Sequence, residues 1–188
     1  MPLPTNGVPT KGMLLVATPP LVDPNFDRTV VLVLEHGESG AIGLVLNRPS
    51  ETPVAAALPG WEDLAAEPAW VFAGGPVSTD SAIALGSARH ADAGGGWEPL
   101  VGDVGTIDLH RDPDDVVHDI AAVRIFAGYS GWGPGQLEDE LSANAWLVVP
   151  AWPQDALGDP DDLWRRVLLR QGGRVAWLAN APFDPSMN

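Results

Sequence analysis

Residues 128–141 contain the clearest candidates for binding or catalysis, in the order Gly-Tyr-Ser-Gly-Trp-Gly-Pro-Gly-Gln-Leu-Glu-Asp-Glu-Leu. A glycine-rich turn that leads into a helix can bind phosphate through free amides and the helix dipole. Here the lysine and hydroxyl of a phosphate-binding loop are missing, and Glu138, Asp139 and Glu140 would repel an anion. We therefore expect a turn in which Tyr129 and Trp132 pack, and both remain candidates for contact with a ligand or partner.

Ser130 lies in the same stretch and resembles a hydrolase nucleophile only in part. The nucleophile elbow needs glycine two residues before and two after the serine. Gly128 meets the first condition, whereas Trp132 occupies the second place. No spacing ties any of the four histidines to Ser130 as a general base. We predict no catalytic residue.

A second candidate group surrounds a predicted hairpin. Glu35 and His36 lie in its loop, and Asn47 and Arg48 close its second strand. We expect these four residues to approach one another at one end of the sheet and to form a binding pocket there. The alternative is that Asn47 and Arg48 hold loop backbone and pair with acids such as Asp23 or Asp27.

The sequence predicts neither a metal site nor a cofactor. It contains no cysteine, which excludes disulfides, thiolate zinc ligands and cysteine nucleophiles. His110 and His118 are eight residues apart, which is no recognised ligand spacing.

The charge balance opposes a polyanionic partner. The formal net charge is −15, from 25 acidic against 10 basic residues, and the acids are spread along the chain. Nucleic-acid affinity rests on Lys and Arg that neutralise phosphates, so direct nucleic-acid binding is not expected. The cluster of Arg165, Arg166, Arg170 and Arg174 is predicted to form salt bridges within an acidic protein. The expected partner is a small molecule or another protein, and the oligomeric state is left open.

Length and hydropathy indicate one domain over residues 1–188, with 1–11 and 180–188 loose. The 188 residues are 45% hydrophobic, enough for one sizeable core. The apolar run 13–17 is too short for a signal peptide or a membrane span. We expect a cytoplasmic protein without a membrane segment.

Short apolar runs bounded by glycine and proline predict many strands. Two β-branched runs flank a glycine-bearing loop and predict the hairpin. The Gly-Gly-Gly segment within 89–102 predicts a mobile surface loop. Strands are expected at 13–17, 29–34, 41–46, 70–73, 81–85, 105–109, 123–127, 145–149 and 174–178.

Helices are predicted mainly from their start signals. The tetrad Asp-Pro-Asp-Asp occurs at 112–115 and 159–162, and each copy offers an N-cap, a proline at the first helical position and acids in the first turn. Residues 51–66 predict one or two short helical pieces, and the acidic stretch after Gly135 another. About four short helices with many strands in irregular order indicate an α+β fold.

Several long motifs together resemble one known family. The resemblance is carried by 12–17, 23–28, Glu35-His36, 40–49, Gly74-Gly75-Pro76-Val77 and 128–141. On these motifs the chain is identified as a member of the YqgE/AlgH family of bacterial proteins. The resemblance runs in order from about Gly12 to the last predicted strand. It departs from the usual pattern at 89–102.

The resemblance implies a mixed, mostly antiparallel bent sheet that closes toward a pseudo-barrel, in a cytoplasmic protein. It supplies no catalytic residues, and some members are described as candidate transcriptional regulators. We therefore expect a non-catalytic binding or regulatory protein. The alternative is an enzyme of unknown reaction with a polar site near Glu35, His36, Asn47 and Arg48.

Overall fold

The computed structural model describes residues 7–182, and within them the chain forms ten strands, six α-helices and one 3₁₀ helix. The strands are β1 (Met13–Ala17), β2 (Val30–Gly37), β3 (Gly40–Val45), β4 (Pro49–Pro53), β5 (Trp70–Ala73), β6 (Val77–Ala88), β7 (Trp97–Val101), β8 (Val104–Ile107), β9 (Ile120–Trp132) and β10 (Trp146–Pro150). The helices are α1 (Val54–Ala57), η1 (Glu62–Leu64), α2 (Pro113–Val116), α3 (Gln136–Ser142), α4 (Pro153–Leu157), α5 (Leu163–Gln171) and α6 (Gly173–Leu178). None of these helices is long and apolar enough to cross a membrane.

The strands form one mostly antiparallel sheet in the order β10-β1-β2-β3-β9-β6-β8-β7. β5 joins β9 in the parallel sense and carries β4 on its other edge. The predicted α+β class and mostly antiparallel sheet are confirmed. The strands at the two ends of this order, β10 and β7, do not pair with each other. The sheet is therefore open and does not close into a barrel.

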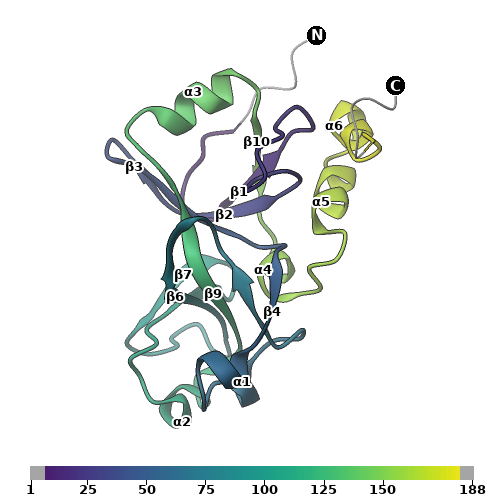
Figure 1. Ribbon diagram of the computed structural model, residues 1–188. Helices are drawn as coiled ribbons and strands as arrows, with labels where there is room; N and C mark the ends of the chain where they lie inside the picture. Colours follow the sequence, from purple (N-terminus) through teal and green to yellow (C-terminus); the bar gives the residue numbers. More distant parts are fainter. Residues whose placement is uncertain (1–6, 183–188) are drawn as a thin grey trace.

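β9 joins the two halves of the molecule (Figure 1). At its C-terminal end, Ser130–Trp132 pair with β3. Toward the N-terminal end of β9, β6 pairs along one edge of the strand. On the other edge, β5 pairs with Phe126 and Ala127. Residues 120–132 are therefore a single long strand that belongs to both parts of the sheet.

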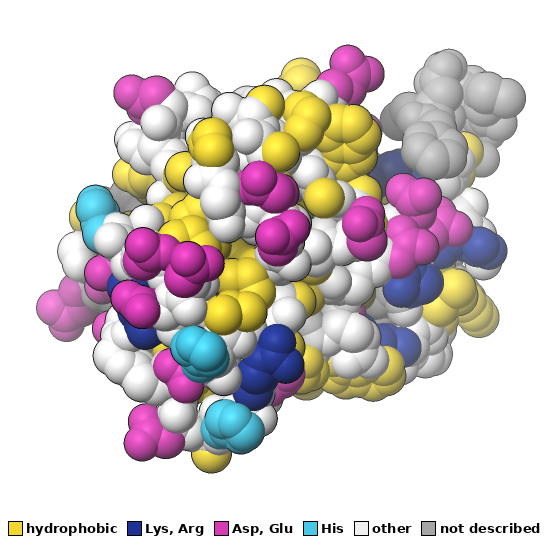
Figure 2. Space-filling view, turned by 90° about the horizontal axis from the view of Figure 1, so that it is seen from below, with side chains coloured by type: hydrophobic (Ala, Val, Ile, Leu, Met, Phe, Trp, Pro, Cys, Tyr) yellow, Lys and Arg dark blue, Asp and Glu magenta, His cyan; other side chains and the backbone are white. Residues whose placement is uncertain are grey.

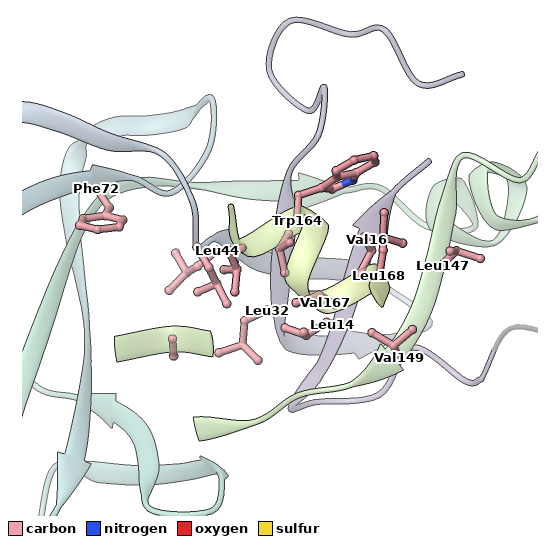
Figure 3. Close-up of a cluster of buried hydrophobic side chains, with 14 of the residues drawn as sticks. Leu14, Val16, Leu32, Leu44, Phe72, Leu147, Val149, Trp164, Val167 and Leu168 are labelled. Carbon is pink, nitrogen blue, oxygen red and sulfur yellow. The ribbon is translucent and has the colours of Figure 1, made fainter. Parts of the chain in front are cut away.

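The half that contains β1, β2, β3 and β10 is buried on both faces, as the continuous apolar runs predict. On one face, α5 packs Trp164, Val167 and Leu168 toward the sheet, as Figure 3 shows. The alternate residues of the same strands, among them Leu15 and Val31, pack on the other face with Trp132 and with Leu137 of α3. Burial of both faces fixes the register of the hairpin, because a slip of one residue would exchange the two sets.

The second half has its own core beneath α1, η1 and α2, with Val54, Leu64 and Val116 packed against β9 residues such as Val123. Of the one or two helical pieces predicted within 51–66, two are present, α1 and η1. The Asp112 tetrad is confirmed as a helix start, since the Asp112 carboxylate accepts the Asp114 amide 3.0 Å away. In the second tetrad, Asp159 instead closes a turn with the Asp161 amide, and α5 begins at Leu163.

Two predicted elements are wrong in part or in whole, and a third is longer than predicted. Residues 97–101 form β7, so the segment 89–102 is not wholly a surface loop. Residues 174–178 lie in α6 and not in a strand. The strand at 123–127 continues through Trp132, which leaves only Gly133–Gly135 as the turn before α3.

The predicted looseness of the termini is tested only in part. Residues 1–6 and 183–188 lie outside the described range. At the inner end of the C-terminal segment, the carbonyls of Ala181 and Pro182 accept hydrogen bonds from Arg28. At the N-terminal side, the Met13 amide donates to Thr10. These contacts involve only the inner ends of the two segments, so the looseness of 1–11 and 180–188 stays a prediction.

Candidate functional site

The two predicted halves of the polar site lie at opposite ends of the β2–β3 hairpin. Glu35 and His36 pair with Ile42 and Ala41 near the hairpin turn. Asn47 follows β3 at the other end, where it bonds to Val30 at the start of β2. Six residues of extended strand separate Val30 from His36, which corresponds to about 20 Å. The expectation that Glu35, His36, Asn47 and Arg48 form one pocket is therefore wrong.

Asn47 and Arg48 hold the loop that precedes β2. The Asn47 carboxamide accepts the Val30 amide at 3.0 Å and donates to the Arg28 carbonyl at 2.9 Å. Arg48 donates to the carbonyls of Pro24 and Asp27, at 3.0 and 2.8 Å. This is the alternative role considered for the pair, with the difference that Arg48 bonds to loop carbonyls and not to acidic side chains.

His36 connects the hairpin to α3. Its Nε2 lies 2.6 Å from Oε1 of Glu138. The backbone N–H of Glu138, and after it the His36 ring, lower the pKa of the Glu138 carboxyl below its usual value. Glu35, the other member of the predicted pair, is exposed on β2. The His36–Glu138 contact therefore serves first to hold α3 on the sheet.

Trp132 lies in an aromatic cluster beneath α3 and is only 6% exposed. Its ring packs against Phe26 and Trp146, with centroids 6.0 and 5.9 Å away. Oε2 of Glu140 accepts the indole N–H of Trp132 at 2.9 Å and that of Trp146 at 2.8 Å. One carboxylate thus satisfies two buried donors, and Trp132 has the packing role that its sequence context predicts.

Tyr129 and Ser130 also lie in β9. Tyr129 is half-buried and packs against the main core. Ser130 is fully buried, and its Oγ donates to the Gly74 carbonyl at 3.1 Å. A serine without access to solvent and bonded to backbone cannot attack a substrate from bulk water, which agrees with the broken elbow motif.

Arg124 is a buried cation that sequence reasoning overlooked. It is 2% exposed, and its guanidinium donates to the carbonyls of Ala156, Gly158 and Glu67 at 2.7 to 3.0 Å. The group also lies over the Phe72 ring, 4.3 Å from its centroid. Burial lowers the pKa of Arg124 to about 10, and the nearby Asp159 opposes that change. Arg124 therefore stays charged at neutral pH and ties α4 and the segment before β5 to β9.

A cleft of about 430 Å³ opens beside the junction of β5, β6 and β9. Its walls come from β4, α1, β5, β6 and β9, so segments far apart in sequence meet there (Figure 1). The described residues that line it are Ser50, Thr52, Ala57, Leu58, Val71, Phe72, Ala73, Thr79, Asp80, Ser81, Ala82, Ile125, Phe126 and Ala127. A volume in this range suits a small organic ligand.

Small side chains leave this space open. Four alanines line the cleft, and three of them, Ala57, Ala73 and Ala82, are exposed. The Phe72 and Phe126 rings are fully buried on the opposite face of the sheet, where they pack edge to face in the main core with centroids 5.9 Å apart. The cleft is thus mainly apolar, with a floor of small side chains on well-packed strands.

The polar rim arises from a bulge in β6. Val77 pairs with Tyr129, but the next pair is Ala82 with Ala127, so four residues of β6 lie between two contacts that are two residues apart on β9. Ser78 adopts φ +47° there, in the left-handed region. The bulge places Thr79, Asp80 and Ser81 at the cleft, and Ser50 closes the opposite side by donating to the Val71 carbonyl at 2.6 Å.

A second cavity of about 470 Å³ lies between the start of α5 and the end of the described chain. Arg28 and Trp164 both line it, and the Arg28 guanidinium is 4.6 Å from the Trp164 ring centroid. Arg28 also holds the Ala181 and Pro182 carbonyls. The wall of this cavity therefore includes the contacts that hold the end of the described chain, so its residues have a structural role.

Charged side chains elsewhere form no obvious centre. Figure 2 shows acidic side chains dispersed over one face among apolar and basic ones. Among residues 7–182, no group of three His, Asp or Glu side chains could hold a metal ion. Arg170, from the predicted basic stripe, forms a bidentate pair with Asp155, both contacts at 2.7 Å.

Comparisons with known proteins agree on one family. The model of the AlgH-like family matches residues 14–176. This chain belongs to the AlgH-like family. The matched range includes every residue of the cleft, and the resemblance expected from the motifs is confirmed.

AlgH-like relatives match over almost their whole length. A UPF0301 protein of Streptomyces avermitilis is 52% identical over 182 residues, which cover 94% of each chain. A UPF0301 protein of Mycolicibacterium smegmatis is 45% identical over 181 residues, 94% of this chain and 90% of the relative.

Solved AlgH-like structures share the fold. The crystal structure of a protein from Corynebacterium diphtheriae superposes with a TM-score of 0.90 at 29% identity and covers 95% of both chains. The solution structure of the AlgH protein from Pseudomonas aeruginosa gives 0.68 at 31% identity and covers 98% of this chain and 100% of AlgH. These likenesses show the fold and the family and identify no ligand.

Proposed function

We propose that this AlgH-like chain is a non-catalytic binding protein and that the cleft beside the β6 bulge is its ligand site. The observation that carries the proposal is the combination of a mainly apolar floor of small side chains with a rim of hydroxyl groups and one carboxylate. Ligand sites are typically apolar concavities with a few polar groups that set orientation and specificity.

Binding is favoured over catalysis by what lines the cleft. An enzyme site brings together titratable groups with perturbed pKa values. Asp80 is the one ionisable side chain among the described residues of the lining. The alternative enzyme site does not assemble, because His36 and Asn47 lie at opposite ends of the hairpin.

A regulatory role would follow from ligand binding. The name of the AlgH relative and the description of some family members as candidate regulators suggest regulation. Since the net charge of −15 disfavours direct nucleic-acid contact, the proposed route is a change in affinity for a protein partner when the cleft is filled. The proposal places the protein in the cytoplasm, as the family resemblance implies.

Thermal unfolding in the presence of fractionated metabolite extracts tests the proposal. Three proteins are compared: wild type, Ala82→Leu, which adds bulk to the cleft wall, and Ala121→Leu, which adds the same bulk to an exposed alanine at the start of β9 outside the lining. A ligand at about 100 times its Kd stabilises a protein of this size by several degrees.

The proposal predicts that an active fraction raises the Tm of wild type and of Ala121→Leu by about 5 °C, and that of Ala82→Leu by much less. An equal shift in all three proteins would place the ligand outside the cleft. A complete set of fractions without effect on wild type would argue against a small-molecule binding protein.

A further inference from the structure

We propose that the ligand of the β6-bulge cleft is a small organic cation, with an apolar body and a terminal ammonium group. This inference rests on the proposed function and adds the chemical class of the ligand. It starts from the residues of the lining, which divide into an apolar majority and a polar group on one side.

The apolar part of the cleft suits a hydrocarbon body. Exposed alanines on β5, β6 and α1 supply apolar surface, and the half-buried Leu58 adds a further apolar wall. Removing apolar surface from water stabilises a complex in proportion to the area buried. A ligand that offered only polar groups would leave this surface without a counterpart.

The polar side of the cleft favours a positively charged ligand. Asp80 carries the one formal charge of the lining, and neither Lys nor Arg is among the described lining residues. An anionic group would meet a like charge without compensation, in a protein whose net charge is already −15. A cation would be attracted by the nearby Asp80 carboxylate and, more weakly, by the negative net charge of the whole molecule.

The ammonium group also matches the hydrogen-bonding capacity of the rim. It has three N–H donors and no acceptor. Thr79, Asp80 and Ser81 all line the cleft at the bulge, and all three side chains can accept hydrogen bonds. A neutral hydroxyl group could use the same acceptors but would gain no charge assistance.

Three probes with one hydrocarbon body test the inference: 4-phenylbutylamine, 4-phenylbutan-1-ol and 4-phenylbutyrate. Their affinities for the full chain are measured by NMR titration at low salt. Asp80 is exposed, so the gain for the cation is modest. We expect the amine to bind about three- to fivefold more tightly than the alcohol, and the carboxylate most weakly.

Two charge-matched variants identify the group responsible. Asp80→Asn should lower the affinity of the amine to that of the alcohol and change the alcohol's affinity less than about twofold. Asp92→Asn removes an equal charge from an exposed position outside the lining and should keep the preference for the amine. In about 0.5 M salt the preference should shrink, because an exposed pair is screened.

The outcomes separate this inference from the proposal on which it rests. Equal affinities of the three probes, or a preference for the amine that survives Asp80→Asn, would overturn the cationic class while the cleft remains a ligand site. Failure of all three probes to bind wild type would overturn both.

Discussion

At the scale of single residues, the side chains that are the best candidates for chemistry instead stabilise the structure. The sequence presents Glu140 as one of three consecutive acids that would repel an anion. In the structure its carboxylate accepts hydrogen bonds from the indole N–H groups of Trp132 and Trp146. Gln136 donates to its other oxygen at 3.0 Å. A carboxylate that satisfies buried donors is a structural group, because unpaired buried donors are costly.

Replacing Glu140 should therefore destabilise the protein much more than replacing an adjacent acid. We expect Glu140→Ala to lower the free energy of unfolding by about 2 to 3 kcal/mol, since two buried indole donors lose their acceptor. Asp139→Ala, in the same turn but exposed, should cost about 0.5 kcal/mol or less. Urea unfolding followed by circular dichroism measures both. Equal losses would show that the indole contacts contribute little.

At the scale of elements, the long strand β9 depends on a glycine where the segment after β5 passes close to it. Gly128 has φ +70°, and a Cβ there would lie 2.6 and 2.9 Å from the carbonyl oxygens of Gly75 and Val77. Gly135 has a similar φ of +75°, but a Cβ there would meet nothing within 4 Å. Alanine substitutions at Gly128 and Gly135 therefore separate two contributions to the loss of stability: the strain of a left-handed backbone, which both would have, and a collision with backbone, which only Gly128 would have.

We expect Gly135→Ala to lower the free energy of unfolding by about 1 kcal/mol and Gly128→Ala by at least about 3 kcal/mol. Denaturant unfolding of the two variants beside wild type gives the difference. If Gly128→Ala were no worse than Gly135→Ala, the close approach of the two segments would not exist in solution.

The contact between α3 and the β2–β3 hairpin should depend on pH. Because the pKa of Glu138 is lowered below 4.5, the unfolded state binds more protons in that region. The stabilisation is thus present above pH 4.5 and is lost as the pH falls through the pKa of the folded state. We expect the difference in urea midpoint between wild type and Glu138→Gln to be larger at pH 6 than at pH 3. In a His36→Gln background the pH dependence of that difference should shrink, and an unchanged dependence would contradict the pairing.

Sequence patterns predict those elements whose signals are local. The apolar runs of β1, β2 and β3 and the glycine-bearing turn between the latter two are each complete within a few residues. Residues 174–178 are a short, mostly apolar run, which predicts a strand, but they lie in the helix α6. In the structure Val175 and Ala179 are buried, a spacing of four, while Trp177 is 74% exposed.

The cleft could not be predicted in this way. Its alanines come from four separate elements, and the bulge that presents Asp80 exists only through the pairing of β6 with β9. The strand β7 lies in a segment whose three consecutive glycines predict a loop, and it forms through pairing with β8, a partner that local sequence does not indicate. One overlooked local signal was Arg124, a charge within the apolar run of β9.

At the scale of the whole molecule, the net charge of −15 governs the choice of partners. Four of the ten basic residues lie close together in the sequence, but Arg170 is already paired with Asp155. We expect no retention of duplex DNA or single-stranded RNA in a filter-binding assay at about 50 mM salt and micromolar protein. Binding that weakens steeply as salt increases would contradict this expectation.

The proposed binding function depends above all on the cleft, where β4, α1, β5, β6 and β9 surround an apolar floor beside Asp80. The most direct measurement is a map of backbone amide shifts in the full chain during titration with 4-phenylbutylamine, in wild type and Ala82→Leu. Binding in the cleft predicts saturable shifts in wild type centred on Ala73, Asp80, Ala82 and Ala127, and their loss in Ala82→Leu. Shifts centred on any other surface, or identical shifts in both proteins, would contradict it.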